Sequence, residues 1–440
     1  MKSLWHDTVS LPPFPRLERD LRTDVLIIGG GLTGILCAYL LAQEGIDYVL
    51  VEAGRICSST SGNTTAKITL QHGLIYHKLI REFGEEKARM YLDANREALA
   101  RYRTLCETPD CDYEVQDAFV YSRTSKQKLY QELAAYATLG IPGEFVKDIP
   151  LPLSVAGAVR IRDQAQFHPL KFAAALVKKL NIFENTPVNA FDGTHFLTPY
   201  GGITAAHTIV ATHFPMFSKH GGYPMKLYQH RSYVIAMAGA PKLNGMYVDE
   251  SGSGFSFRSH GDLLLLGGGA HRTGKPGDGW KELRAFARQH WPDAQEVFHW
   301  AAQDCMSLDS VPYIGEYSAG KADLSVATGF NKWGITSSMV AAILLSNRIL
   351  GRETPWAAVF SPARSILRPQ LLSNIFHAGA NLLTLTAPRC PHMGCALKWN
   401  PKERSWDCPC HGSRFDKNGH LLDGPANADH PKLSLRRKDS

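Results

Sequence analysis

The N-terminal part of the chain contains apolar runs of two lengths. Thr23 to Ile28 is a short, mainly apolar run of strand length, and Leu32 to Glu44 is a longer one that closes at Gly45, as a helix does. Tyr48 to Val51 is a second run of strand length. A buried strand, a helix and another buried strand in this order predict one βαβ unit, and therefore a parallel sheet.

The middle of the chain alternates between helical and strand patterns. The helical patterns span Glu82 to Glu107, Ser125 to Leu139 and Pro169 to Leu180, and the short apolar runs span Thr208 to Ala211, Leu263 to Leu266 and Leu324 to Ala327. A last helical pattern runs from Ile335 to Leu350 and stops at Gly351. This order predicts an α/β core with an inserted α+β region.

The C-terminal part changes in character. Arg352 to Ala380 contains three prolines, and we expect an irregular linker or wrapping segment there. The last 60 residues are rich in Cys, His, Pro, Gly and Asn, and Asn381 to Thr386 is the one strand pattern ahead of their first cysteine. A chain of 440 residues is long enough for two or three domains.

Composition and charge exclude several classes of protein. Hydrophobic residues make up 44% and charged residues 20%, which are ordinary globular values and not those of a disordered chain. The net charge is +7, and a solvated tail explains the basic cluster Arg436 to Lys438, so nucleic-acid binding is not expected. Val25 to Ala42 is uncharged over 18 residues, but four glycines in its first ten positions indicate a strand, a turn and a helix, not a membrane span.

The cysteines and the N-terminus indicate a compartment. His6, Asp7 and three prolines in the first fifteen residues leave no room for an apolar signal-peptide core, so we expect a cytoplasmic location. Nine cysteines in such a chain are expected to be ligands or buried thiols, not a disulfide framework. Four of them fall within 21 residues near the C-terminus.

A dinucleotide fingerprint follows the first predicted strand. Gly29, Gly31 and Gly34 have the spacing G-x-G-x-x-G, and Glu52 ends the next strand. Gly29 permits the sharp turn, Gly31 lets the backbone approach a pyrophosphate, and Gly34 lets helix and strand pack closely. The phosphate then lies at the positive end of the helix, and Glu52 accepts hydrogen bonds from the adenosine ribose. NAD and FAD both use this fingerprint, so it does not choose between them.

From about residue 20 to residue 352 the chain resembles the D-amino-acid oxidase superfamily of flavoproteins, which includes glycine oxidase and sarcosine oxidase. The resemblance rests on four ordered segments. It implies bound FAD, and it implies three segments that contact FAD beyond the fingerprint. These are Ser58–Lys67 with Thr64 and Thr65, Ile209–His213 with Ala211 and Thr212, and Ala327–Thr336 with Gly329, Trp333, Gly334 and Ile335. The fourth segment, Trp300–Asp304 with Asp309–Gly315, precedes the last FAD strand.

The last of these segments has a physical rationale. It delivers the N-terminus of the helix predicted from Ile335, whose unpaired N–H groups and positive dipole end can stabilise negative charge on the reduced flavin. The alternative is that Gly329 and Gly334 only begin a helix.

Substrate residues are expected in the region from Met225 to His271. The family often fixes a substrate carboxylate with arginine, and Arg258 and Arg231 are the candidates, because a bidentate pair orients the reacting carbon. Either arginine could instead be an ordinary surface residue. Lys67 is a third candidate, for polarising the flavin or binding substrate, against a structural ion pair. His72, His168 and His230 are possible bases among 18 histidines.

The C-terminal cysteines and histidines form a second motif. Cys390-x-His392 is followed, after fifteen residues, by Cys408-x-x-His411, which resembles the Rieske pattern. The resemblance implies that Cys390 and Cys408 bind one iron of a [2Fe–2S] cluster and that His392 and His411 bind the other. Zinc is the alternative, because two cysteines and two histidines also suit a tetrahedral ion.

Further residues extend the resemblance to the respiratory type of Rieske protein. Cys395 and Cys410 match its paired extra cysteines, which imply a disulfide between the cluster loops. Ser413 matches a donor to a bridging sulfide, Phe415 replaces the usual tyrosine, and Gly424–Ala426 resembles the proline loop over the cluster. The module is shortened ahead of its first ligand. Either the flavin domain supplies the missing support, or the cluster is labile or absent.

These patterns predict an FAD-dependent oxidoreductase acting on the CH–NH group of an amine or amino acid, with electrons passed to the cluster and an unidentified acceptor. The rivals are an oxidase that uses oxygen, with a structural Rieske module, and an electron-transfer or redox-sensing protein without a small-molecule substrate. The expected domains are an oxidoreductase at 1–352 (FAD-binding parts about 20–100, 150–215 and 300–352; substrate parts about 101–149 and 216–299), a linker at 353–380 and a small all-β Rieske module at 381–440.

Overall fold

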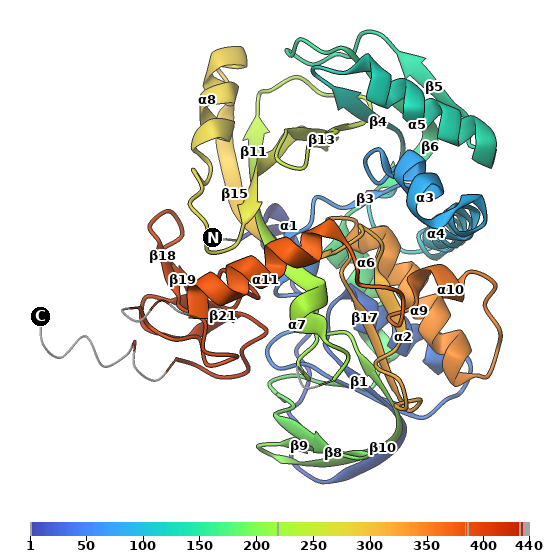
Figure 1. The fold of residues 1–440 in the computed structure, drawn as a ribbon, viewed down its shortest axis with the longest axis vertical. Helices are drawn as coiled ribbons and strands as arrows, with labels where there is room; N and C mark the ends of the chain where they lie inside the picture. Colours follow the sequence, from blue (N-terminus) through green and yellow to red (C-terminus); the bar gives the residue numbers. More distant parts are fainter. Residues whose placement is uncertain (1, 218–219, 383, 385–386, 431–432, 434–440) are drawn as a thin grey trace, which may run out of the picture.

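Three β-sheets form the frame of the molecule (Figure 1). The computed structural model describes residues 1–440 except 1, 218–219, 383, 385–386, 431–432 and 434–440. The basic cluster Arg436 to Lys438 therefore lies outside the described residues. Two large sheets build the oxidoreductase part, and a small sheet builds the C-terminal module.

The first sheet has eight strands and contains the predicted βαβ unit. Its strand β1 (Leu21–Ile28) pairs in parallel with β2 (Tyr48–Val51) on one side and with β10 (Gly201–Val210) on the other. The order is β16-β17-β10-β1-β2-β7, with β9 attached to β10 and β8 to β9. The remaining strands are β7 (Ile182–Phe183), β8 (Ala190–Asp192), β9 (His195–Thr198), β16 (Tyr313–Glu316) and β17 (Leu324–Thr328).

Helices cover the first sheet and bury its apolar side chains. α2 (Leu32–Gln43) and α9 (Gly334–Ile349) pack together, and most residues of both are buried. Burial on nearly all sides explains why α2 has the composition of a membrane span. Among the described residues, no helix is long and apolar enough to cross a membrane. The other helices here are α1 (Leu4–Thr8), η1 (Thr60–Asn63), α3 (Ile75–Phe83), α4 (Glu85–Leu105), α6 (Pro169–Leu176) and η2 (Val177–Lys179).

The second sheet has nine strands in the order β15-β11-β14-β13-β12-β4-β6-β3, with β5 beside β6. Buried aromatic residues such as Tyr121, Phe257 and Trp280 pack against it, and α5 (Lys126–Leu139) and α8 (Lys281–His290) cover it. Its strands are β3 (Lys67–Ile68), β4 (Glu114–Ser122), β5 (Gly143–Val146), β6 (Gly157–Gln166), β11 (Leu227–Ala238), β12 (Met246–Asp249), β13 (Ser256–His260), β14 (Leu263–Arg272) and β15 (Gln295–Ser307).

The predicted helices are present with shifted ends. The pattern from Glu82 to Glu107 is divided at Gly84, whose φ of 84° separates α3 from α4. Ser125 precedes α5, and its hydroxyl accepts a hydrogen bond from the Lys128 N–H, as an N-cap does. Pro169 lies in the first turn of α6. That helix ends earlier than predicted, and a 3-10 turn follows.

The segment between the two parts is partly helical, so the prediction of irregular structure from Arg352 to Ala380 is wrong. It contains α10 (Ala357–Phe360) and α11 (Pro369–Leu382). α11 begins at a proline, which suits the first turn because no N–H is needed there. The predicted strand from Asn381 is also wrong at its start, because Asn381 belongs to α11; Leu383, Leu385 and Thr386 lie outside the described residues.

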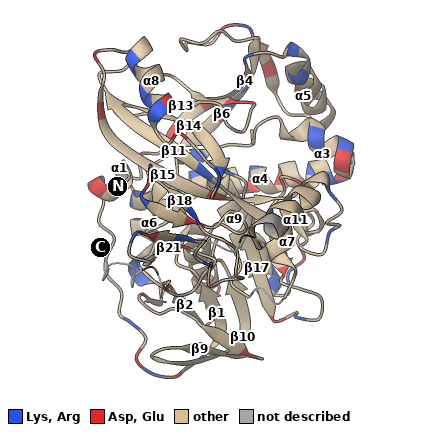
Figure 2. Ribbon diagram, turned by 60° about the vertical axis from the view of Figure 1, so that its left-hand side comes forward, with Lys and Arg blue, Asp and Glu red and all other residues tan. Residues whose placement is uncertain are grey.

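The C-terminal module is a small antiparallel sheet beside the lower end of β15 (Figures 1 and 2). Its strands β18 (Lys398–Asn400), β19 (Ser405–Asp407), β20 (Arg414–Asp416) and β21 (Leu421–Asp423) pair in sequence order. Ahead of β18, the pairing found in the described part of the module is one isolated bridge between Arg389 and Ala396. The short helix α7 (Tyr223–Lys226) packs against α11.

Candidate functional site

One cavity of about 1020 Å³ is lined mostly by residues 28–338 of the oxidoreductase part. The predicted dinucleotide turn, the hydroxyl-rich loop, the second FAD segment and the closing turn all line it. Residues 421–427 of the C-terminal module line it as well. The cavity therefore brings together segments from both predicted cofactor sites.

The dinucleotide turn has the close packing that a pyrophosphate site needs. Gly29 has φ 112°, and a Cβ there would lie 2.6 Å from the carbonyl oxygen of Ala211. A Cβ at Gly34 would collide with the carbonyl oxygen of Gly29. Gly31 precedes α2 and has no side chain that could cap it, so the helix N-terminus borders the cavity that Gly31 lines. Backbone N–H groups at such a terminus bind phosphate.

Glu52 lies at the end of β2, as the fingerprint requires. Its carboxylate accepts hydrogen bonds from the N–H groups of Gly30 at 2.7 Å and Gly54 at 2.8 Å. Burial raises the pKa of this carboxyl, and the backbone N–H groups oppose that effect. Glu52 lines the cavity, and its contact with an adenosine ribose remains a prediction.

The hydroxyl-rich loop is held by its own hydroxyl groups. Ser61 Oγ accepts a hydrogen bond from the N–H of Leu32 at 2.9 Å, and Thr64 Oγ1 accepts one from Ala66. Lys67 Nζ donates to Thr65 Oγ1 at 3.0 Å. Burial, assisted by the nearby Arg258, lowers the pKa of Lys67 to about 7. Thr64, Thr65 and Lys67 all line the cavity, as do Ala211 and Thr212.

The closing turn carries three residues with positive φ. Gly329 has φ 71°, Asn331 has φ 53° and Lys332 has φ 75°, and the Asn331 amide donates to the Gly329 carbonyl oxygen at 2.6 Å. The turn leads to Trp333, which precedes α9 and has no side-chain cap. The open N-terminus of α9, with Gly334 and Ile335, therefore borders the cavity as predicted from the closing turn.

Neither candidate arginine borders the cavity. Arg258 is buried, and its Nη1 donates to the carbonyl oxygens of Thr65 and Ala66, both at 2.8 Å. It therefore fixes the backbone of the hydroxyl-rich loop. Arg231 pairs with Glu403 of the C-terminal module. The structure therefore gives no support to either as the ligand of a substrate carboxylate, and neither is a surface residue.

The alternation of strand β11 explains the position of Arg231. Tyr228, His230 and Ser232 line the cavity, whereas Gln229 and Arg231 point to the opposite face and contact the C-terminal module. Successive side chains of a strand point to opposite faces. His230, named above as a possible base, is therefore at the cavity, and burial lowers its pKa to about 3.

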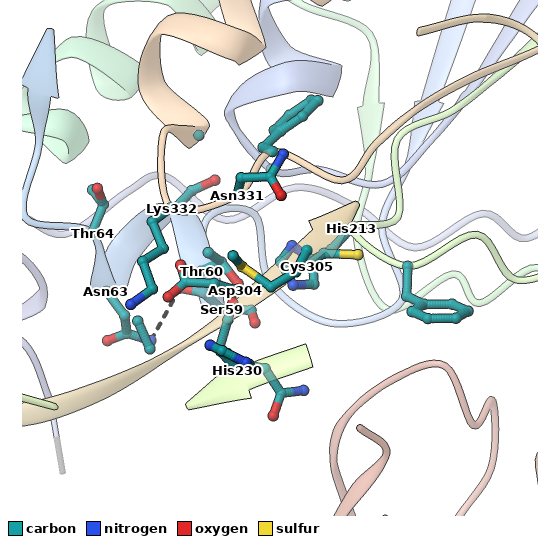
Figure 3. A pocket seen from close by; sticks show the side chains of 18 of the residues that line it. Ser59, Thr60, Asn63, Thr64, His213, His230, Asp304, Cys305, Asn331 and Lys332 are labelled. Carbon is teal, nitrogen blue, oxygen red and sulfur yellow. Dashed lines mark hydrogen bonds between the residues drawn. The ribbon is translucent and has the colours of Figure 1, made fainter. Parts of the chain in front are cut away.

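Two charged residues that the sequence patterns do not single out project into the same region. Figure 3 shows Lys332 of the closing turn and Asp304 of β15 around the space that His230 also borders. Burial lowers the pKa of Lys332, and its Nζ donates to the carbonyl oxygen of Gly252 at 2.6 Å. Both residues fall within the segments that carry the family resemblance, so the place of Lys332 next to the FAD-binding helix is the signal that could have found it.

Two similar loops carry the four predicted cluster ligands. Each loop is closed by two backbone hydrogen bonds, which join Cys390 to Cys395 and Gly394 in one loop and Cys408 to Gly412 and Ser413 in the other. The thiols of Cys390 and Cys408 are buried and hydrogen bonded, and the hydrogen bonds lower the pKa of Cys390 to about 7. The rings of His392 and His411 are perpendicular, with centroids 5.0 Å apart.

The donor set fits a two-iron cluster better than one zinc ion. Among the described residues, no three ligand atoms from these two cysteines and two histidines lie within 4.8 Å of one another, as a single ion would require. Nδ1 of His411 is buried without a hydrogen-bond partner in the described structure, so it is available to a metal. The predicted disulfide between Cys395 and Cys410 joins the two loops, and the Ser413 hydroxyl interacts with Cys390.

The oxidoreductase part supports the shortened module. Gln229 Nε2 donates to the carbonyl oxygen of His411 at 2.7 Å, and Gln303 Nε2 donates to that of Gly412 at 2.8 Å. The side chain of Glu403 is 3% exposed and pairs with both Arg231 and Arg414. Burial alone would raise its pKa, but the two arginines outweigh burial and lower it to about 2. These contacts replace the strands that the module lacks.

Comparisons with known proteins agree with both sites. A family model described as DAO, FAD dependent oxidoreductase, matches residues 24–348, and a model of the Rieske [2Fe-2S] domain matches residues 374–434. The chain therefore belongs to the DAO family of FAD-dependent oxidoreductases and carries a C-terminal Rieske domain. The predicted fold class is confirmed, as are the two cofactors, FAD and a [2Fe–2S] cluster.

Individual relatives cover both parts. A putative Rieske 2Fe-2S iron-sulfur protein, YhfW of Bacillus subtilis strain 168, is 34% identical over 97% of this chain and 96% of its own length. Glycine oxidase from Geobacillus kaustophilus has a TM-score of 0.65 at 22% identity, over 78% of this chain and 99% of its own. L-amino acid deaminase from Proteus vulgaris has a TM-score of 0.63 at 17% identity, over 81% and 97% respectively. The two solved structures show the fold alone.

Proposed function

We propose that this chain is an amine or amino-acid dehydrogenase whose electrons pass from FAD to the [2Fe–2S] cluster and then to an external acceptor. One observation carries the proposal: the cavity that holds the dinucleotide turn is also lined by residues 421–427 of the Rieske module. FAD held by the dinucleotide turn and the closing turn would supply a hydride acceptor for the carbon that bears the nitrogen, and a cluster held by the two cysteine–histidine loops would supply one-electron transfer. The chain binds and orients the substrate and connects the two sites.

Charged side chains in the cavity favour an amino acid over a neutral substrate. Lys332 and Asp304 carry opposite charges around one space (Figure 3), and a zwitterionic amino acid offers a carboxylate to the first and an ammonium to the second. The lowered pKa of His230 keeps its imidazole neutral at pH 7, so it can hydrogen bond the substrate without adding charge. The names of the structural neighbours, glycine oxidase and L-amino acid deaminase, favour the same substrate class.

Lys67 remains a candidate for polarising the flavin or holding the substrate. It lines the cavity, and its pKa of about 7 leaves a large fraction as the neutral amine at neutral pH. A neutral amine can take up a proton from the substrate ammonium, which must lose one before the hydride leaves.

Phe214 supplies a short connection between the two sites. It follows Ala211, Thr212 and His213, which line the cavity. The centroid of its ring lies 5.9 Å from that of His411 and 6.2 Å from that of His392. The backbone that borders the FAD site therefore continues directly to a side chain in contact with both histidine ligands, which supports electron transfer between them.

The test is an anaerobic screen of amino acids and amines on the protein loaded with FAD and cluster. We expect one substrate class to bleach the flavin absorbance and to produce the EPR signal of a reduced Rieske cluster in the same sample. A Cys408→Ser variant should still bleach but should give no cluster signal. Bleaching by substrate without any cluster signal in the loaded wild-type protein would contradict the electron route.

A second function is favoured by the buried contacts that join the module to the oxidoreductase part. The Arg231–Glu403 pair could make the module a structural support, with oxygen as the acceptor for the flavin. In that case the Cys408→Ser variant would form hydrogen peroxide from substrate and oxygen at the wild-type rate. The dehydrogenase proposal predicts little peroxide from the wild-type protein.

A further inference from the structure

Helix α11 (Pro369–Leu382) leaves one apolar face uncovered. Its inner face is fixed by Asn374, whose side chain accepts a hydrogen bond from Arg272 at 2.9 Å and donates to the carbonyl oxygen of Met225 at 3.2 Å. Its outer face and Leu367, two residues ahead of the helix, form what we call the apolar stripe. The exposed fractions of its side chains are 83% for Leu367, 72% for Leu372, 49% for Ile375, 71% for Phe376 and 47% for Leu382.

The spacing of the apolar stripe places its members along one side of the helix. Leu372, Ile375 and Phe376 are three or four residues apart, and Leu382 lies one or two turns further on the same side. A surface helix normally turns its apolar side inward, and α11 does the reverse. Single exposed apolar residues are ordinary, but a contiguous row of them marks an interaction surface.

The charges around the apolar stripe are positive. α11 has no charged residue, and it is entirely tan in the described part of Figure 2. Residues 354–402 contain five Arg and Lys and no Asp or Glu. Arg364 and Arg368 pair with Asp309 and Glu82 of other segments, so the positive charge of this stretch comes from Arg389, Lys398 and Lys402. Arg389 donates to the carbonyl oxygen of Leu382 at 2.9 Å, so a cation lies at the C-terminal end of the helix. Burial lowers the pKa of His377 on α11, and the positive charges of Arg272 and Lys275 lower it further.

We propose that the apolar stripe is a peripheral membrane-binding surface that enters the interface of a bilayer containing anionic lipid. Apolar side chains of such a helix reach the boundary of the acyl chains, while flanking basic residues meet lipid phosphates. The basic residues Arg389 and Lys275 near α11, with no acidic residue on the helix itself, complement anionic lipid. A surface for another protein is expected to carry polar partners around its apolar centre, and α11 offers none that is charged.

The surface is continuous with the cluster loops. The N–H of Ala396 donates to the carbonyl oxygen of Asn381 at the end of α11, and Met393, next to the ligand His392, is 49% exposed. A membrane bound at α11 would therefore lie beside the loop that carries the cluster. This inference goes beyond the proposed function and concerns binding by the resting protein, so it stands or fails independently of electron transfer.

The test is flotation of the full-length holoprotein with vesicles. One vesicle type contains phosphatidylcholine alone and the other contains equal parts of phosphatidylcholine and phosphatidylglycerol. We expect binding to the anionic vesicles, weakened by added salt, and a fall of at least about tenfold in a Leu372→Ser/Phe376→Ser variant, because both membrane-inserted apolar side chains are lost. The matched control is Val115→Ser/Tyr130→Ser, which removes two exposed apolar side chains away from the stripe. Val115 on β4 is 52% exposed and Tyr130 on α5 is 53% exposed. This variant should bind as the wild type does.

Three outcomes would overturn the inference. The wild-type protein could fail to float with either vesicle, or the stripe variant could float as well as the control. The third is a wild-type dimer in light scattering that becomes monomeric in the stripe variant while vesicle binding is absent, which would assign the surface to a second copy of the chain. The substituted side chains are exposed, so flavin and cluster absorbance should be unchanged in every variant.

Discussion

The FAD site and the cluster site are built in opposite ways. The FAD site gathers segments from residues 29–34, 60–67, 211–213 and 329–335, which two large sheets hold in place. The cluster site uses two loops between Cys390 and His411 on a four-stranded sheet that has little core of its own. A small sheet cannot bury enough surface to be stable alone. The cluster site therefore depends on the interface between the parts, whereas the FAD site does not.

The largest expected effect separates the two sites completely. Cys408→Ser removes one predicted thiolate ligand of the cluster, so we expect loss of iron and acid-labile sulfide with FAD content retained. Metal analysis and flavin absorbance measure both in one sample. Cys106→Ser, at a half-buried cysteine outside the two sites, should keep both cofactors. Loss of FAD from the Cys408→Ser variant would break the comparison.

The reverse separation is expected from Gly34→Ala. The new Cβ would collide with the carbonyl oxygen of Gly29, so the dinucleotide turn must shift and FAD should be lost or bound much more weakly. Iron content should remain. Gly45→Ala is the control for overall stability, because a Cβ there meets nothing within 4 Å; its positive φ is expected to cost only local strain. Equal loss of both cofactors in Gly34→Ala would show that the sites are not independent.

The interface can be tested through its buried ion pair. Glu403→Gln leaves Arg231 and Arg414 without their shared carboxylate, and removing one partner of a buried pair costs about 3–5 kcal/mol. We expect the cluster to be released at lower urea concentration than in the wild type, while flavin release is little changed. Glu44→Gln breaks the exposed pair with Arg352 and should change the free energy of unfolding by less than about 1 kcal/mol.

Low pH should weaken the interface between the two parts, as Glu403→Gln does. The pKa of Glu403 is about 2, below its ordinary 4.5, because the two arginines outweigh burial. The stabilisation from this carboxylate is therefore fully present above pH 4.5 and is lost as the pH falls from 4.5 towards 2. Urea titrations of cluster absorbance across that window should show the loss, and Glu403→Gln should flatten it. An identical acid profile in the variant would assign the effect to other carboxyl groups.

The smallest effect sharpens the assignment within the FAD part. Lys332→Gln removes a cation from the cavity, and a charge-assisted hydrogen bond contributes about 1.5–3 kcal/mol, so KM for an amino acid should rise about 10-fold to 100-fold. KM for the corresponding amine without a carboxylate should change little. Lys281→Gln on α8 is the surface control. Equal changes for both substrates would remove Lys332 from carboxylate binding.

Motifs whose residues are close in sequence can be predicted, and contacts between distant segments cannot. Gly29, Gly34 and the predicted ligand pairs Cys390–His392 and Cys408–His411 have a characteristic spacing, so the amino-acid sequence alone is enough to propose them. Arg231 is open to a substrate role on sequence grounds, because its ion-pair partner Glu403 lies 172 residues away in the module and gives no local signal. Nothing local to β11 indicates that its odd-numbered side chains face a second domain.

Helix α11 escapes prediction for a different reason. Three prolines suggest irregular chain, although Pro369 lies where a helix tolerates it best. Surface helices are usually predicted from a polar, charged face that alternates with an apolar one. The exposed side of α11 is apolar, so this pattern is missing. For the shortened module, the sequence allows either support from the flavin domain or a labile cluster. The hydrogen bonds from Gln229 and Gln303 to the loop of His411 and Gly412 are the support that the first alternative expects.

Strand β11 gives the two redox centres a fixed separation. On one face His230 borders the cavity, and on the other Gln229 contacts the loop of His411 and Arg231 pairs with Glu403, so the proposed electron route would cross a single strand. Electron tunnelling rates fall steeply with distance, and a rigid spacer makes them uniform from molecule to molecule. Inserting one residue into β11 would exchange its two faces, turning the cavity side chains toward the iron loops.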